Sequence, residues 1–150
     1  AAGVVLPSKP STIFVSVSKR HKDSIVGLSR RLVDMGHSLV ATEGTAQRLE
    51  SEGIVVERVK KIAEGRPNVV DKMNDGVIAL VINTPSGKGA RTDEGRIRAA
   101  AVQLGIPCIT TIQAAEAAVK AMEALRLEDM TVEALQDRFP RVETGQMVTV

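Results

Sequence analysis

Short apolar segments recur along the chain, and the residues between them carry apolar side chains at helical spacing. Several of the apolar segments lack a polar face, as expected of strands that are buried on both sides. Strands that alternate with helices form parallel sheets covered by helices. The pattern therefore predicts an α/β fold in which a five-stranded parallel sheet is flanked by helices in three layers. The expected strands are 12–17, 38–42, 54–59, 77–82 and 107–111, and the expected helices are 22–35, 44–53, 68–76, 93–105 and 114–125.

The two ends of the chain differ from its middle. Residues 1–11 are rich in proline and small residues, which predicts a linker or the cut end of a longer chain. Residues 12–138 are expected to form one domain. Within it, 127–137 should add a final helical turn or two with Thr131 as N-cap. Residues 139–150 are predicted to be a loose tail.

Composition excludes several classes of function. The chain has two aromatic residues, too few for the stacking platforms of a single-stranded nucleic-acid binder. A net charge of +2, spread along the chain, is too weak for a general nucleic-acid binder. Cys108 is the single cysteine, so no intrachain disulfide forms and a reducing cytoplasm is expected. The apolar run VIALVI is far shorter than the roughly 20 residues of a membrane helix. We therefore expect a soluble, cytoplasmic protein.

Polar residues suited to phosphate follow four of the five predicted strands. The turn at 42–45, Thr-Glu-Gly-Thr, would bring two hydroxyls and free N–H groups to a helix start. Lys22 and Lys61 supply point charges, and Arg66 suits an oxyanion in a bidentate pair. The Asn83 amide suits a base edge or a ribose. Ligands of such folds bind beyond the carboxyl ends of the strands, so these residues are expected to form one site.

Each of these residues also has a purely structural interpretation. A Thr-x-Gly-Thr turn is often only a helix cap, and 83–87 forms a turn whatever its function. A basic cluster such as 19–22 is more often a solvated face than a binding site. The remaining candidates are predicted as follows: Asp71 as a surface charge, His21 and His37 as exposed side chains, and Cys108 as a small core residue.

Five longer motifs occur in order: SVSKRHKD, VATEGTA, VKKIAEGRPNVVD, INTPSGKGARTDEGRIRAAAVQLGIP and TTIQAAEAAVKAM. Through them the chain resembles the methylglyoxal synthase-like domain at the C-terminus of carbamoyl phosphate synthetase large subunits. The resemblance covers about residues 12–126. It implies a Rossmann-like, five-stranded parallel sheet, in agreement with the strand pattern.

The resemblance also implies a regulatory domain without catalytic or metal-binding residues of its own. Uridine monophosphate would bind as an inhibitor and, in some bacteria, inosine monophosphate as an activator. The residues that match the family motifs are Lys22, Thr42 and Thr45 for the effector phosphate, and Lys61, Asn83, Thr84 and Ser86 for the rest of the nucleotide. A second effector, ornithine, would act near Thr110 and Thr111. Family members can carry an aromatic residue there, whereas this chain has Cys108 and Ile109.

Partners and cofactors follow from the same resemblance. The partners would be the other domains of the synthetase large subunit and its glutamine amidotransferase small subunit, without nucleic acid or membrane. The domain itself would need no cofactor. ATP together with magnesium or manganese and potassium ions would act elsewhere in the synthetase, which serves arginine or pyrimidine biosynthesis.

An enzyme of the same fold is the main alternative. Methylglyoxal synthase converts dihydroxyacetone phosphate into methylglyoxal and phosphate, and it needs a carboxylate base with nearby acid/base groups. Asp71 matches one such carboxylate. The enzyme carries Trp-Asp-Pro where this chain has Asn83-Thr84-Pro85, and the histidine expected shortly afterwards is absent from 88–93. A third relative, the inosine monophosphate cyclohydrolase domain, differs in its motifs between the third and fourth strands. The sequence thus favours binding without catalysis.

Overall fold

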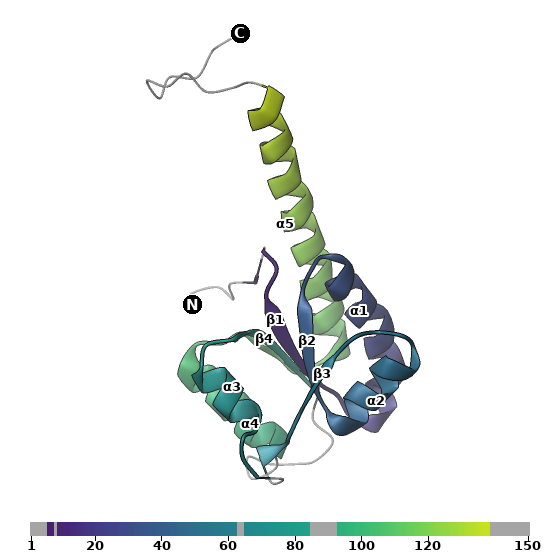
Figure 1. Cartoon of the computed structure of the whole chain (residues 1–150), viewed down its shortest axis with the longest axis vertical. Helices are drawn as coiled ribbons and strands as arrows, with labels where there is room; N and C mark the ends of the chain where they lie inside the picture. The colour runs from purple at the N-terminus through teal and green to yellow at the C-terminus, as the bar shows by residue number, and fades with distance from the viewer. Residues whose placement is uncertain (1–5, 8, 63–64, 85–92, 139–150) are drawn as a thin grey trace.

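The computed structural model describes residues 6–7, 9–62, 65–84 and 93–138. Strands and helices alternate along the chain, as the sequence pattern predicts (Figure 1). The strands are β1 (Thr12–Ser16), β2 (Ser38–Thr42), β3 (Glu57–Val59), β4 (Ile78–Asn83) and β5 (Cys108–Ile109). The helices are the short 3₁₀ helix η1 (Lys19–His21), α1 (Lys22–Asp34), α2 (Glu43–Ser51), α3 (Val69–Asn74), α4 (Asp93–Leu104) and α5 (Ile112–Arg138).

All the strand pairs are parallel, and the strand order is β3-β2-β1-β4-β5. The chain starts in the middle of the sheet, builds one half as β2 and β3, and then returns to the other side of β1 with β4. The order therefore reverses between β1 and β4. In open α/β sheets the crevice at such a reversal, beyond the carboxyl ends of the strands, is where ligands bind. The topology thus directs attention to residues that follow Ser16 and Asn83.

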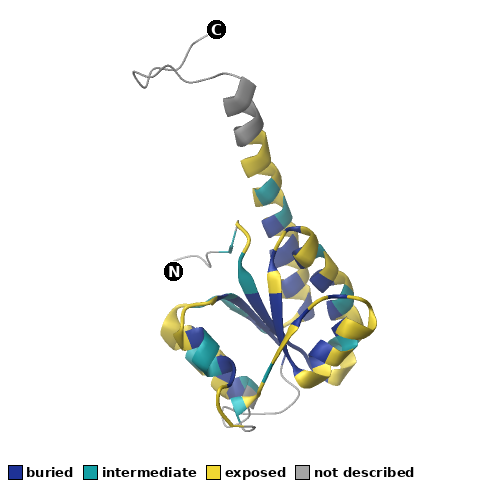
Figure 2. Ribbon diagram, viewed as in Figure 1, coloured by how far each residue is buried: buried dark blue, intermediate teal, exposed yellow. Residues whose placement is uncertain are grey.

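Alternate residues of the strands pack into two separate apolar cores. Ile13, Val15, Leu80 and Ile82 face a core that is completed by α1, α2 and α5. Residues on the other face of the same strands, with Phe14 at their centre, face α3 and α4. This is the period-two alternation of a pleated sheet, and it produces the three layers (Figure 2). The predicted fold class is confirmed.

Three predicted boundaries are wrong. The helix expected to end at residue 125 continues as α5 through Arg138 and extends beyond the sheet (Figure 1). Thr131 does not cap a new helix, because its hydroxyl donates to the Leu127 carbonyl, 2.9 Å away, inside α5. β3 begins at Glu57 rather than residue 54, and β5 is limited to Cys108–Ile109. Each of these is an edge strand with one neighbour, and it pairs with only part of that neighbour: β3 with Val40–Thr42 and β5 with Val81–Ile82.

His37 is buried, so the prediction that it is exposed is also wrong. Its relative exposure is 5%, and its Nδ1 accepts a hydrogen bond of 3.1 Å from the Ser11 N–H, just before β1. The Ser38 N–H in turn donates to the Ser11 carbonyl at 2.9 Å. Burial, and then the nearby Arg126 guanidinium, lower the pKa of His37. The neutral imidazole therefore holds the segment that enters β1.

Acidification should destabilise the domain through His37. Because folding lowers its pKa, the unfolded chain binds the proton first, and stability falls as the pH drops below the ordinary histidine value of about 6.5. Thermal unfolding of the wild type and of His37→Asn, compared from about pH 7.5 to about pH 5.5, measures this. The variant should lose less stability over this interval than the wild type. Equal losses in the two proteins would contradict the assignment.

Candidate functional site

Three of the predicted phosphate-binding residues meet at the end of β1. The Thr42 hydroxyl lies 3.0 Å from Ser16 Oγ, and the Thr45 hydroxyl accepts a 3.2 Å hydrogen bond from the Val17 N–H. Lys22 donates from Nζ to the Val17 carbonyl at 3.0 Å. We call Ser16, Lys22, Thr42 and Thr45 the cradle. The pairing of β1 with β2 brings them together, because the two strands end side by side while α1 and α2 begin there.

The cradle surrounds the beginning of α2. Thr42 is the N-cap residue, yet its side chain makes no capping hydrogen bond. The Thr42 side chain therefore leaves the first N–H groups of α2 available as hydrogen-bond donors. Gly44 lies beneath Lys22, since a Cβ placed at Gly44 would be 3.5 Å from both Cε and Nζ. The ammonium thus lies at the positive end of a helix dipole. That arrangement is unfavourable for a cation alone and favourable once an anion bridges the two.

The electrostatics of the cradle point in the same direction. Lys22 forms no ion pair with any residue that the structure describes. Partial burial, and then the positive charge of Lys61, lower its pKa. Thr42 and Thr45 are 2% and 1% exposed. The Lys22 ammonium, two buried hydroxyls and a helix start therefore converge in the cradle, and an oxyanion would neutralise the ammonium.

Two of the residues predicted for the rest of the nucleotide, Asn83 and Thr84, lie at the end of β4. Asn83 is buried, its Nδ2 donates to the Glu94 carbonyl at 2.9 Å, and its Oδ1 has no hydrogen-bond partner among the described residues. Thr84 is buried, and its hydroxyl accepts from the Ser18 N–H at 2.9 Å. Lys61 lies near enough to Lys22 to affect its pKa. Ser86 falls outside the described residues.

Sequence reasoning did not single out Ser16, Ser18 or His21 as site residues. Ser18 Oγ lies 3.0 Å from His21 Nδ1, and Thr84 Oγ1 lies 3.1 Å from the same nitrogen. His21 is half-buried, so the prediction that it is exposed is wrong. The sequence feature that could have indicated these residues is the pair of serines in SVSK, which follows the apolar part of the first strand. Ligands bind at this end of the strands in this kind of fold.

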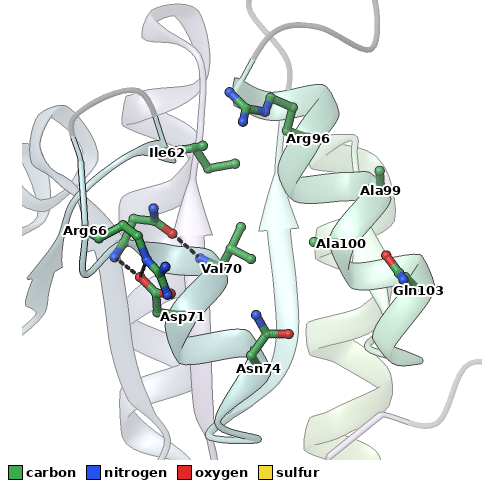
Figure 3. A pocket seen from close by; sticks show the side chains of 10 residues that line it. Ile62, Arg66, Val70, Asp71, Asn74, Arg96, Ala99, Ala100 and Gln103 are labelled. Atoms are coloured by element: carbon green, nitrogen blue, oxygen red, sulfur yellow. Dashed lines mark hydrogen bonds and ion pairs between the residues drawn. The ribbon is translucent and has the colours of Figure 1, made fainter.

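Arg66 and Asp71 differ from their predicted roles. Arg66 donates to Asp71 at 2.6 Å, and the Asn68 N–H donates to the same carboxylate at 2.7 Å as part of a capping box at α3 (Figure 3). Asp71 is therefore a helix-capping residue rather than a free surface charge. The hydrogen bond from Arg66, and then the one from the Asn68 backbone, lower the pKa of Asp71. Arg66 therefore pairs with a carboxylate in this structure, with its side chain 82% exposed.

Two hollows lie elsewhere on the described part of the chain. One, of about 650 Å³, lies between α3 and α4 and is lined by the Arg66–Asp71 pair, Arg96 and Gln103 (Figure 3). The other, of about 420 Å³, lies at the ends of β4 and β5, where Thr84 meets Thr110 and Thr111. Neither hollow is lined by a cradle residue. The structure thus separates the predicted second effector region from the predicted phosphate site.

Some kinds of site are absent from the described residues. Within the described ranges, no group of three or more His, Cys, Asp or Glu side chains is arranged to hold a metal ion. A search of the same ranges found no helix long and apolar enough to span a membrane.

Comparison with known proteins shows which family the chain belongs to. The family described as the MGS-like domain matches residues 24–110. The chain is 57% identical over 139 residues to the carbamoyl phosphate synthase large chain of Rhodopirellula baltica, which covers 93% of this chain and 13% of that protein. It is 48% identical over 138 residues to the Methanopyrus kandleri protein named carbamoyl phosphate synthase large chain, C-terminal section, covering 91% of this chain and 25% of that protein.

A solved structure supports the fold independently. The structure of ForH superposes with a TM-score of 0.51, covers 87% of this chain and 96% of its own, and is 19% identical. At that identity the likeness concerns the fold alone. The family match and the two sequence relatives settle the classification: the chain belongs to the MGS-like domain family, and nine-tenths of it is similar to a section of carbamoyl phosphate synthase large chains.

Proposed function

We propose that this chain is the nucleotide-sensing regulatory domain of a carbamoyl phosphate synthase large chain. The observation that carries the proposal is the cradle, in which Lys22 and two buried threonines converge on the start of α2. The effector would be a nucleoside monophosphate, either uridine monophosphate as inhibitor or inosine monophosphate as activator. Its phosphate would neutralise the cradle.

The hydrogen bonds already present leave the right donors for a phosphate. Thr45 accepts from the Val17 N–H, so its own hydroxyl proton is available. Lys22 uses one N–H on the Val17 carbonyl, which leaves two of its three donors. The first-turn N–H groups of α2 add further donors along the helix axis. A phosphate oxygen would thus meet charge-assisted donors from three directions.

The rest of the nucleotide would extend toward β4. There the unpartnered Asn83 Oδ1 would accept a hydrogen bond from a ribose hydroxyl or a base N–H. Lys61, Thr84 and Ser86 would complete this part of the site. Because the Thr84 hydroxyl already accepts a hydrogen bond from the Ser18 N–H, its main role would be to hold together the ends of the segments that follow β1 and β4.

The environment of Asp71 favours binding over proton abstraction. A general base in methylglyoxal synthase chemistry has to take a proton from the substrate. Here two donors hold the Asp71 carboxylate and lower its pKa, which makes it a weaker base. Where the enzyme carries Trp-Asp-Pro this chain has Asn83-Thr84-Pro85, so Thr84 takes the place of the aspartate, and 88–93 contain no histidine. The domain would therefore bind its effector without altering it.

Regulation would require the bound nucleotide to favour one state of the synthase over another. β1 is the physical link we propose for this coupling. Its carboxyl end carries Ser16 of the cradle, and its first residue follows Ser11, which His37 holds. A shift of β1 on effector binding would reach the segment that precedes the domain. The other synthase domains and the amidotransferase small subunit would lie beyond that segment, in the cytoplasm.

Two measurements on the same preparation test this proposal. Calorimetric titration with uridine, inosine and adenosine monophosphates should give one-site binding for the uridine or the inosine nucleotide. Incubation with dihydroxyacetone phosphate should release phosphate no faster than buffer. Phosphate release well above buffer would favour the enzyme instead. Absence of binding by all three nucleotides would refute the sensor.

A further inference from the structure

The last part of α5 is not covered by the described part of the domain. Met122 is 1% exposed, whereas all of residues 127–131 are exposed, and Figure 1 shows the helix continuing past the end of the sheet. We call the end of this helix, residues 127–138, the α5 projection. At a rise of 1.5 Å per residue it is about 18 Å long. Helices of this length are marginally stable in water alone, and in proteins their stability comes mostly from an apolar face packed against a partner.

The α5 projection carries both apolar side chains and net negative charge. Leu127 is 65% exposed and Met130 is 52% exposed, and a spacing of three places them on the same side of the helix. Between 127 and 138 the chain has four acidic residues and one basic residue: Glu128, Asp129, Glu133, Asp137 and Arg138. Such a helix fits an apolar groove with a basic border.

The base of the projection is attached firmly to α1. The Arg31 Nε donates to Glu123 Oε2 at 3.1 Å, and a second nitrogen of the same guanidinium pairs with Oε1. Met122 packs in the same core as Leu32 of α1. The helix therefore leaves the domain in a defined direction, so a contact made by the projection would orient the whole domain.

The incoming chain passes beside the base of the projection. A Cβ placed at Gly36 would lie 3.3 Å from Pro10 Cγ and 4.0 Å from a guanidinium nitrogen of Arg126. Arg126 also donates to the Met35 carbonyl in the same turn. One turn thus contacts both the segment that enters β1 and the residue at which the projection begins. Whatever precedes this segment in the parent protein is tethered next to the projection, at a high effective concentration.

We propose that the α5 projection docks on the domain that precedes this one in the carbamoyl phosphate synthase large chain. Most of each sequence relative lies outside the section that this chain matches, and a C-terminal domain has that remainder before it. The docking surface would be an apolar groove bordered by basic residues. This contact would hold the domain at a fixed angle to its neighbour. The proposal rests on the part of the proposed function that places the chain in a large chain, and it does not depend on nucleotide binding in the cradle.

Hydrogen exchange, compared between the 150-residue chain and the full-length large chain, tests this proposal. Amides of 127–138 should exchange at least about tenfold more slowly in the large chain, where the projection is docked. Amides of the buried part of α1, around Ile25 and Leu32, provide the internal reference. Both samples are free of nucleotide, so a failure of nucleotide sensing would leave this result unchanged. Equal exchange of 127–138 in the two proteins would overturn the proposal.

A double variant, Leu127→Gln with Met130→Gln, removes the apolar pair and keeps good helix formers. In the large chain it should return the exchange of 127–138 to the rate seen in the 150-residue chain. Val102→Gln is the matched control, because Val102 is 72% exposed on α4, which packs on the other face of the sheet. This control should keep the slow exchange.

The 150-residue chain shows whether the variants still fold. Both should keep the unfolding temperature of the wild type within a few degrees, because the substituted side chains are exposed. Slow exchange of 127–138 that persists in the double variant of the large chain would contradict the proposal. A dimer of the 150-residue chain in light scattering, with 127–138 already protected, would instead assign the projection to a second copy.

Discussion

Replacing Lys22 with methionine is expected to weaken uridine monophosphate binding by about 10- to 100-fold. Methionine keeps an unbranched apolar stem above Gly44 and removes the ammonium that would pair with the phosphate. Hydrogen bonds to a charged group contribute about 1.5–3 kcal/mol, which corresponds to that range. Isothermal titration of the wild type and the variant measures the change in Kd directly.

The control for this variant is Lys9→Met. Lys9 is exposed and precedes β1, so it lies at the opposite edge of the sheet from the cradle. Its substitution should leave the nucleotide Kd unchanged, while both variants keep the unfolding temperature of the wild type within a few degrees. Wild-type affinity in Lys22→Met, with the fold intact, would place the phosphate elsewhere.

Phe14→Ala is expected to cost about 3–5 kcal/mol of folding free energy. Phe14 is fully buried in the core between the sheet and α3–α4, which it shares with aliphatic side chains, Met73 and Ala101. Truncation would open a cavity that this packed core fills only in part. A loss of this size is a large part of the roughly 5–15 kcal/mol by which a domain is usually stable.

Urea unfolding at equilibrium measures this loss, and Phe14→Leu serves as the matched variant. Leucine retains most of the buried apolar volume, so it should cost clearly less than alanine does. If both variants lose the same small amount of unfolding free energy, the core between the sheet and α3–α4 is loosely packed. The three-layer account of the domain's stability would then be wrong.

The fold was largely predictable because strands that are covered by helices on both faces appear in the sequence as short continuous apolar segments. In VIALVI, Leu80 and Ile82 meet the core of α1, α2 and α5, while Ile78 and Val81 meet the core of α3 and α4. The sequence pattern does not predict the lengths of the strands at the two edges of the sheet. β3 and β5 each have one partner, so their lengths depend on the register with β2 and β4, which composition does not encode.

The site was predictable in part. Lys22, Thr42 and Thr45 lie at or shortly after the ends of predicted strands, and parallel strands bring their carboxyl ends together. The wrong predictions concern residues whose environment is set by a single contact with another side chain or backbone group. Arg66 is taken by Asp71, three positions after the cap residue Asn68, and His37 is buried because the incoming Ser11 covers it. Such contacts join positions whose spacing carries no periodic signal.

The central claim is that the cradle is the phosphate site of a nucleotide sensor. A crystal structure of the domain with uridine monophosphate tests it most directly. We predict a phosphate oxygen within about 3 Å of Lys22 Nζ and of Thr45 Oγ1, on the axis of α2. A nucleotide bound at another place, with the cradle unoccupied and Lys22 still on the Val17 carbonyl, would contradict the account.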